Sequence, residues 1–530
     1  MLSRGARQAY LPAHKFPALR PQRYGIRLSQ CPTRRYTTDK GPRFSANPVH
    51  EQLSTHAAFT VRIFLRWLKY STIGIFAVGL TSFTAFEGVH MYVENSTLAP
   101  ETDEEVRKWQ WDAEAERWTG GEAGGTDPGL GFFGRHAVRA AWMAQNWGIG
   151  TEGSVMSSNA FTGRAGAGVG GLNIVEARLE VAQAFLNIAL QHAKARMSSE
   201  SIRPQTIMEL LARHANIMER MGQRDALYEA RSEYERVWAG LPGKGVDAAR
   251  IALKLGDVNR RLGDYEDALA WWSRTVQLVY NQTVPSQLPA IPSALPSEPL
   301  AQRTMLSVLV SLSAYYSTTG QLRQAQTLQE SALNVIRSLR QPESLEAASP
   351  PEALHALFVL HRSSLLSIHL AEVLYALRKK QTASMEWLTR AASSAERVAL
   401  VLTGLPPIHP DAPESKIPHP PSSDAPLVTV YAKSNSMSKP AGSLLRDARR
   451  TAAEAWNLMG ILSEGSEAPR SMERAQECYE RALGWAGVAA DGSGNIGKAG
   501  EGTLETEWKA LWNNYVRARA AVKVQELNKK

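Results

Sequence analysis

Residues 249–272, ARIALKLGDVNRRLGDYEDALAWW, carry the pattern that decides the fold of this 530-residue chain. Apolar residues recur three or four positions apart on both sides of Gly263-Asp264-Tyr265, which predicts two amphipathic helices joined by a short turn. Gly256 in the first helix and Ala268 in the second are small, so the two helices can approach each other closely. Neither helix can bury its apolar stripe alone, and the pair therefore predicts neighbours of the same kind.

These offsets match the tetratricopeptide repeat, in which pairs of helices stack into a solenoid. The same offsets recur in units that start near Leu306, Leu365, Ala453 and, less closely, Met208. Amphipathic helices without any repeat are the alternative, because their period alone supplies many of the apolar matches. The joint agreement of Gly, Ala and aromatic positions in the units at Ala249 and Leu306 favours the repeat. We therefore expect an all-α fold, a tetratricopeptide-repeat (TPR) helical solenoid.

A solenoid of this kind also indicates where a ligand would bind. The first helix of each pair lines a concave groove, with five recurring positions facing inward. In the three central units these positions include Arg250, Leu253, Asp257, Arg260, Arg261, Val310, Ala314, His369 and Val373. The set changes from charged to small to apolar, which suits extended or unfolded polypeptides better than a single sequence motif. The alternative is that these side chains are merely solvated.

Residues 70–86, YSTIGIFAVGLTSFTAF, contain no charge and lie between a basic and an acidic flank. A helix needs about 17–25 mostly apolar residues to cross a bilayer, so the run predicts one transmembrane helix over residues 67–93 with its basic side inside. A buried helix of a soluble domain is the alternative. Within the run, Ala77, Thr81 and Ala85 form a small-residue stripe that would let a second membrane helix pack closely.

The N-terminus indicates which membrane. Residues 1–36 are rich in Arg and hold no acidic residue, which is typical of a mitochondrial transit peptide, and residues 37–66 would follow as a matrix-facing basic segment. The alternative is a basic arm that binds nucleic acid or a membrane surface. Residues 1–70 carry 13 basic and 2 acidic residues, whereas the remaining 47 and 49 nearly balance. The body thus lacks the positive surplus that nucleic acid requires. We expect a single-pass protein of the mitochondrial inner membrane, with its N-terminus in the matrix and most of the chain in the intermembrane space.

The composition of residues 172–530 divides this region into repeats and linkers. Repeats are expected over residues 172–403, interrupted by a Pro-rich linker at 283–299. The Pro-rich stretch 404–442 predicts a mobile insertion, and the last repeat follows at 443–486. Residues 487–530 predict a Gly-rich linker and a capping helix, because the last repeat of a solenoid otherwise exposes an apolar face.

The juxtamembrane segment, residues 94–171, is rich in Gly and holds five of the 14 Trp of the chain. Trp is enriched at the centres of protein interfaces, so these residues are candidates for docking a partner. They are Trp109, Trp111, Trp118, Trp142 and Trp147. The alternative is that they pack on the first repeats or on the bilayer surface.

Residues 98–147, which follow one predicted span and precede the repeats, resemble a fungal mitochondrial inner-membrane family. Members of that family are substrate adaptors of the i-AAA protease, an ATP-dependent quality-control protease that faces the intermembrane space. The resemblance implies a non-enzymatic adaptor that binds unfolded or misassembled client polypeptides and delivers them to the i-AAA protease complex. A TPR assembly scaffold for a respiratory-chain complex is the alternative, and it would bind a few defined proteins in place of many unfolded ones.

Motifs for catalysis and cofactor binding are weak. Residues 166–171, GAGVGG, match a GxGxxG pattern, but no βαβ pattern surrounds them. The His residues are scattered without metal-ligand spacing, and only Cys478 would remain after removal of the transit peptide. We expect no cofactor, no metal ion and no small-molecule substrate, and we predict that the protein is not an enzyme. A catalytic site would have to come from the 404–442 stretch.

Overall fold

The structure is a computed structural model, and it describes most of the helical part of the chain. The described residues are 48–114, 118–148, 154–156, 174–197, 202–280, 294–405 apart from 341, 343 and 346, 426–487 apart from 467 and 468, and 508–529. The chain divides into two compact units, Met1–Thr81 and Ser82–Lys530. Several sequence predictions fall wholly or partly outside the described residues, namely the transit peptide, residues 37–47 of the matrix-facing segment, the GAGVGG stretch, residues 283–293 of the Pro-rich linker, residues 406–425 of the Pro-rich insertion and residues 488–507 of the segment 487–530.

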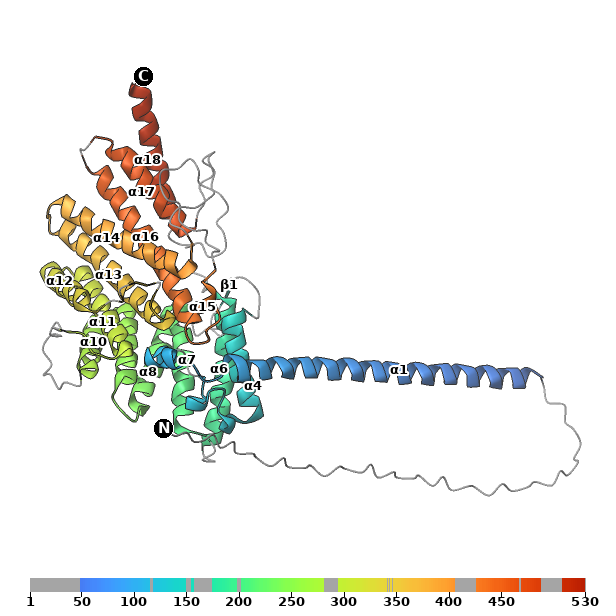
Figure 1. Cartoon of the computed structure of the whole chain (residues 1–530). Coiled ribbons are helices and arrows are strands. Elements are labelled where there is room, and N and C mark those ends of the chain that lie inside the picture. The colour runs from blue at the N-terminus through green and yellow to red at the C-terminus, as the bar shows by residue number, and fades with distance from the viewer. Residues whose placement is uncertain are drawn as a thin grey trace, which may run out of the picture. The chain divides into compact units, whose positions relative to one another are not determined.

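Helix α1 (Pro48–Tyr92) contains the whole uncharged run and continues into a π-helical turn, η1 (Val93–Thr97). Within the described chain, two helices are long and apolar enough to cross a membrane, the helix His56–Thr97 and α13 (Pro350–Ala376). None of the apolar window of the first is buried, whereas 61% of the window of α13 is. Helix α13 is therefore a core helix of the body, and α1 remains the candidate span (Figure 1).

The described part of the second unit is helical apart from one short pair of strands, and its helices pack as successive pairs in a solenoid-like arrangement (Figure 1). This confirms the predicted fold class at the level of a helical solenoid. The main helices are α4 (Gly131–Trp147), α6 (Ala177–Arg196), α7 (Pro204–Met221), α8 (Arg224–Gly240), α9 (Val246–Leu262), α10 (Tyr265–Val279), α11 (Pro299–Thr318), α12 (Leu322–Ser338), α13, α14 (Gln381–Thr403), α16 (Ser438–Glu464), α17 (Ser471–Ala486) and α18 (Trp508–Lys529). The helices that pair are α4 with α6, α7 with α8, α9 with α10, α11 with α12, α13 with α14 and α16 with α17.

Short elements connect these pairs. They are α2 (Glu104–Lys108), α3 (Trp111–Glu114), the 3-10 turns η2 (Gly121–Ala123) and η3 (Pro128–Leu130), α15 (Thr429–Ala432), and the strands β1 (Ser154–Met156) and β2 (Ile174–Glu176). The strands pair antiparallel and are the one exception to the helical prediction among the described residues.

The close approach predicted for the paired helices is visible at two glycines. A Cβ atom at Gly256 of α9 would collide with the indole of Trp272 on α10. At the other end of the solenoid, a Cβ atom at Gly460 of α16 would collide with the ring of Tyr479 on α17. Both aromatic side chains are buried. A small residue facing a large ring thus sets the separation of the helices in two distant pairs.

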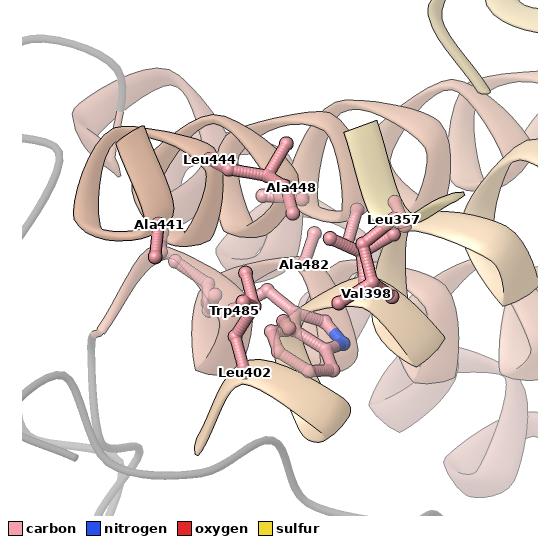
Figure 2. Packing of buried hydrophobic residues seen from close by; sticks show 14 of the residues in the cluster. Leu357, Val398, Leu402, Ala441, Leu444, Ala448, Ala482 and Trp485 are labelled. Atoms are coloured by element: carbon pink, nitrogen blue, oxygen red, sulfur yellow. The ribbon is translucent and has the colours of Figure 1, made fainter. Parts of the chain in front are cut away.

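The largest core cluster joins the last two helix pairs. Leu357 of α13, Val398 and Leu402 of α14, and Trp485 of α17 meet the Ala-rich side of α16 (Figure 2). Alanines such as Ala448 let the helices approach until the larger side chains fill the space between them. Leu511 and Tyr515 of α18 join the same cluster, so the C-terminal helix covers an apolar surface that α17 would otherwise expose.

The predicted insertion 404–442 needs correction. Residues 406–425 lie outside the described residues, but the later part belongs to the body. Tyr431 of α15, Met437 and Ala441 are buried in the largest core cluster, and α16 already begins at Ser438. The high Pro content of the first half of this stretch concealed the apolar spacing of the second half.

Candidate functional site

The first helices of the central pairs, α9, α11 and α13, lie next to one another and share one face. We call it the first-helix face and define it by Lys254, Asp257, Arg260, Ser311, Ala314, Arg362, His369 and Glu372. The side chains of Lys254, Asp257, Arg362 and His369 are surrounded by protein on most sides, yet each retains some exposure to solvent.

Hydrogen bonds connect the helices across this face. Asp257 of α9 accepts hydrogen bonds from Oγ of Ser311 on α11, at 2.8 Å, and from Nε1 of Trp272, at 3.2 Å. Nδ1 of His369 on α13 lies 3.0 Å from Oγ of Ser313 on α11. Lys254 pairs with Glu219 of α7 at 3.1 Å. The face therefore has a fixed polar framework.

Burial shifts the protonation of several groups on the first-helix face. It raises the pKa of Asp257, although Ser311 donates a hydrogen bond to the carboxylate. Burial and the nearby Arg260 lower the pKa of His369 to about 4, so its imidazole is neutral at pH 7. The side chain of Glu372 is exposed, but surrounding protein reduces its solvation and, with the Glu454 carboxylate, raises its pKa to about 7. These surroundings therefore favour the neutral forms of Asp257, His369 and Glu372.

Two arginines of this face have unsatisfied donors. The Nε atoms of Arg260 and Arg362 are buried and have no hydrogen-bond partner within the described part of the chain. A buried donor without an acceptor costs about 1–3 kcal/mol, so a change of side-chain rotamer that brings either guanidinium to an acceptor, such as a peptide carbonyl, would be favourable.

One edge of the solenoid is already occupied by a segment of the same chain. Residues 96–114, which we call the strap, include α2 and α3 and contact α9, α11, α13 and the segment between α15 and α16. Ser436 donates a 2.6 Å hydrogen bond to Glu101, and Asn435 donates one of 2.8 Å to the carbonyl of Ser96. The strap thus connects helices that are distant in sequence.

Two arginines bind the strap through its backbone. Arg303 of α11, only 2% exposed, donates to the carbonyls of Trp109 and Gln110 at 3.1 and 3.0 Å. Arg250 of α9 donates to the carbonyls of Ala113 and Glu114 at 2.8 and 3.2 Å. Because every residue type has a backbone carbonyl, this mode of binding does not depend on sequence.

Side chains add to the strap contacts. Trp111, 1% exposed, donates through Nε1 to the carbonyl of Pro351 at 2.9 Å, and the guanidinium of Arg303 lies 3.9 Å from its ring centroid. Oε1 of Gln110 accepts from the backbone N–H of Leu300 in the first turn of α11, at 2.9 Å. The Glu114 carboxylate pairs with Arg303. These contacts cover the N-terminal ends of α11 and α13.

The predicted groove residues divide into three groups. Asp257, Arg260, Ala314 and His369 lie on the first-helix face, whereas Arg250 binds the strap. Leu253 and Val310 pack against the core at the edge of the face, and the exposed Arg261 donates to the carbonyl of Glu219 at 3.0 Å.

The prediction for Val373 is wrong. Its side chain is 1% exposed and lies in a core cluster, while its neighbour Glu372 points outward. Adjacent residues of a helix point in directions about 100° apart, so an error of one position in the repeat register exchanges a groove residue for a core residue. Glu372 was missed because the predicted position fell on its neighbour Val373, and Arg362 because it precedes the unit that starts near Leu365. Arg303 carried no signal because its partners lie far away in sequence.

The five tryptophans are placed differently from one another. Trp109 is partly buried beside His355, and Trp111 is buried in the strap. Trp118 is buried in the cluster around α4 and α6, and Trp142 packs against that cluster. Trp147 is 45% exposed and is the only one of the five that presents a large apolar surface to solvent. Packing on the body, the alternative interpretation from sequence, therefore describes most of them.

The small-residue stripe of α1 is accessible. Ala77, Thr81 and Ala85 are all exposed along the helix. The hydroxyl of Thr81 donates to the carbonyl of Ala77 at 2.8 Å, which satisfies its hydrogen bond within the helix. The stripe therefore presents a surface that a second helix could contact without leaving a polar group unpaired.

One group of possible metal ligands occurs within the described residues, formed by His214, Glu229 and Glu233. Nδ1 of His214 on α7 lies 2.7 Å from a carboxylate oxygen of Glu233 on α8, and both are buried. Glu229 is exposed. We interpret the His214–Glu233 contact as a structural hydrogen bond that joins two adjacent helices.

Comparisons with known proteins give little. No model of a known protein family matches the chain, and no curated protein matches it. Among solved structures, the chain is similar to the crystal structure of BtubC (BKLC) from P. vanneervenii, at 14% identity over 54% of this chain and 96% of that chain, with a TM-score of 0.29. A TM-score this low carries no inference about fold or function.

Proposed function

We propose that this protein is a non-enzymatic, TPR-like adaptor anchored in the mitochondrial inner membrane. It binds unfolded or misassembled polypeptides on the first-helix face and delivers them to the i-AAA protease. Helix α1 spans the membrane, with the N-terminus in the matrix and the solenoid in the intermembrane space. Holding a client beside the protease raises the effective concentration of the client without any new chemistry.

The binding of the strap is the observation that supports this proposal most directly. Arg250 and Arg303 hold four backbone carbonyls of residues 109–114, so the solenoid already binds one polypeptide segment partly through its backbone, a mode that is open to any sequence. Arg260, farther along α9, and Arg362 on α13 have buried Nε atoms without a hydrogen-bond partner among the described residues. The strap carbonyls bind the Nη atoms of Arg303, and we expect client carbonyls to bind the guanidinium groups of Arg260 and Arg362 in the same way.

The charge of the face suits many clients. Lys254, Arg260 and Arg362 lie beside Asp257 and Glu372, so the face offers hydrogen-bond donors and acceptors to clients of different composition. An adaptor for quality control must accept clients that share little beyond exposed backbone. The membrane location rests on the exposed apolar surface of α1 and on the Arg-rich, acid-free composition of residues 1–36.

Site-specific photocrosslinking in isolated mitochondria tests the proposal. A photoreactive amino acid replaces Glu372 on the first-helix face, and in a matched control it replaces Glu330, an exposed glutamate on α12. We expect the probe at 372 to capture assorted unfolded polypeptides, and the i-AAA protease to co-purify with both proteins. Equal capture at 372 and 330 would contradict binding on the first-helix face.

The same experiment separates the adaptor from the assembly scaffold. Crosslinks to a few defined subunits, with one respiratory-chain complex recovered and no protease, would contradict the adaptor and support the scaffold. Replacing Arg260 and Arg362 together by Gln should reduce capture at 372 while leaving membrane anchoring unchanged, because neither residue is on α1.

A further inference from the structure

An aromatic cluster lies beside the end of the uncharged run. Phe86 is the last residue of that run, and its ring stacks on His136 of α4 with ring centroids 5.8 Å apart. His136 in turn lies 4.0 Å from the ring of Phe132, and its Nε2 is 2.9 Å from a carboxylate oxygen of Glu87. These contacts bring the start of α4 to the level of the last residues of the run.

The first residues of α4 expose a large apolar surface at this level. Phe132 is 56% exposed and Phe133 is 69% exposed, and their rings meet edge to face at 5.5 Å. A second exposed pair, Tyr92 of α1 and Trp147 at the end of α4, lies with ring centroids 6.4 Å apart. We call these four residues together with Phe86 the aromatic collar.

A basic residue lies next to the collar. Arg196, near the end of α6, reaches the turn before Phe132, where a Cβ atom at Gly131 would collide with its guanidinium. Exposed aromatic rings with Lys or Arg beside them are the composition that favours the boundary between acyl chains and phosphate headgroups.

Charge and location together identify the occupant of this surface. A soluble protein partner could cover any exposed aromatic patch, but this patch is continuous with the end of the one described helix whose apolar surface is unburied. When residues 70–86 span the bilayer, Phe86 lies at its surface, and side chains in contact with Phe86 and His136 lie at that surface too. Leaving Phe132 and Phe133 in water there would be less favourable than placing them among lipid.

We infer that the aromatic collar inserts into the interfacial layer of the phospholipid bilayer, so that the body is held against the membrane by a second contact besides its transmembrane helix. This inference rests on the membrane span of the proposed function. Phe132 and Phe133 are the inserting residues, and Arg196 faces the phosphates.

Depth-dependent fluorescence quenching of the full-length protein tests the inference. With Cys31 replaced by Ser and Cys478 buried, single substitutions Phe133→Cys, Phe83→Cys and Tyr375→Cys are labelled with a polarity-sensitive dye. The proteins are reconstituted into vesicles of phosphatidylcholine and phosphatidylglycerol that carry nitroxide-labelled lipid. Phe83 lies within the run, and Tyr375, 60% exposed on α13, is a matched aromatic outside the collar.

We expect the probe at 133 to be quenched several-fold more than the probe at 375 and most strongly by nitroxide near the headgroup. Quenching at 133 equal to that at 375, with strong quenching at 83, would overturn the collar and leave the span intact. A blue-shifted probe at 133 without quenching by lipid would show that protein, such as a second copy of the chain, covers the patch. Absence of quenching at 83 would overturn the span and the collar together.

Discussion

Helices α1 and α13 pass the same test of length and apolar composition, yet they have different environments. Most of the apolar window of α13 is buried by α11, α12, α14 and α16, while none of that of α1 is buried. Apolar surface must leave water in either case, because its burial is worth about 25 cal/mol per Å². For α13 the other helices provide the cover, and for α1 the proposed cover is lipid. Hydropathy therefore identifies a helix whose apolar surface must be buried, and only the packing shows whether other helices bury it.

The burial of α13 is tested most strongly at Leu366, where we expect the largest effect. This side chain is fully buried in a core cluster, so Leu366→Asp places a charge where no partner exists. We expect a loss of about 4 kcal/mol or more in the free energy of unfolding of the body, enough to prevent folding. Circular dichroism and protease resistance of the purified chain measure it. A cooperative, near-parental unfolding transition would contradict the core position of α13.

Trp111→Ala tests how much the strap contributes to the burial of α13, because Trp111 packs against the start of that helix. Loss of this buried indole should cost about 3–5 kcal/mol of unfolding free energy, since Pro351 and Arg303 lose their contacts and a cavity remains. Chemical denaturation measures the change. Trp147→Ala is the control, and its exposed side chain should change stability by less than about 0.5 kcal/mol. Equal effects of the two substitutions would contradict the assignment of Trp111 to the core.

A charge introduced into α1 should weaken its membrane insertion without changing the stability of the body. Val78→Asp lies at the middle of the uncharged run, where an aspartate costs about 3 kcal/mol of insertion. We expect a fraction of the protein to become extractable from membranes at alkaline pH, while the thermal unfolding of the body is unchanged. Destabilisation of the body would mean that α1 is a core helix like α13.

A smaller effect is expected from Glu372 on the exposed side of α13. Its pKa is raised from 4.5 to about 7, so the folded protein holds a proton that the unfolded chain releases between these values. Stability should therefore fall as pH rises through this window. Glu372→Gln should flatten that slope and stabilise the protein slightly at pH above about 7, because the exposed side chain is screened by solvent. Denaturation at several pH values measures the slope, and an unchanged slope would place the titration elsewhere.

The smallest effect on stability is expected at the stripe of α1. Thr81→Leu with Ala85→Leu leaves the body untouched and should change its unfolding free energy by less than about 0.5 kcal/mol. Recovery of the i-AAA protease in mild detergent should nevertheless fall if α1 packs against a membrane helix of the protease. Undiminished recovery would confine the contact with the protease to the soluble body.

The sequence predicted the features of the fold that repeat. The close helix approach at Gly256 could be recognised because the two helices are neighbours in sequence and their small residues recur at similar spacing, and the structure adds the facing rings of Trp272 and, at Gly460, of Tyr479. Spacing alone could not place Val373, since a one-residue error in register turns a helix position from the face to the core.

The strap was beyond prediction for a different reason. Arg303 binds residues 109 and 110 from nearly two hundred positions away, and no local pattern encodes such a contact. The candidate site was therefore predicted only where its residues follow the repeat, as Asp257, Arg260, Ala314 and His369 do. The backbone-binding arginine that supports the proposed function most directly became visible only in three dimensions.

The strap also dictates the order in which the chain can fold. Trp111 contacts a residue 240 positions later, and Ser96 one that lies 339 positions later. Contacts of such sequence separation form late, because a long loop must close before they add any stability. During synthesis or translocation from the N-terminus, residues 96–114 therefore emerge long before their binding site exists. Until α16 has followed, the nascent protein itself presents an exposed aromatic segment of the kind that quality-control systems bind.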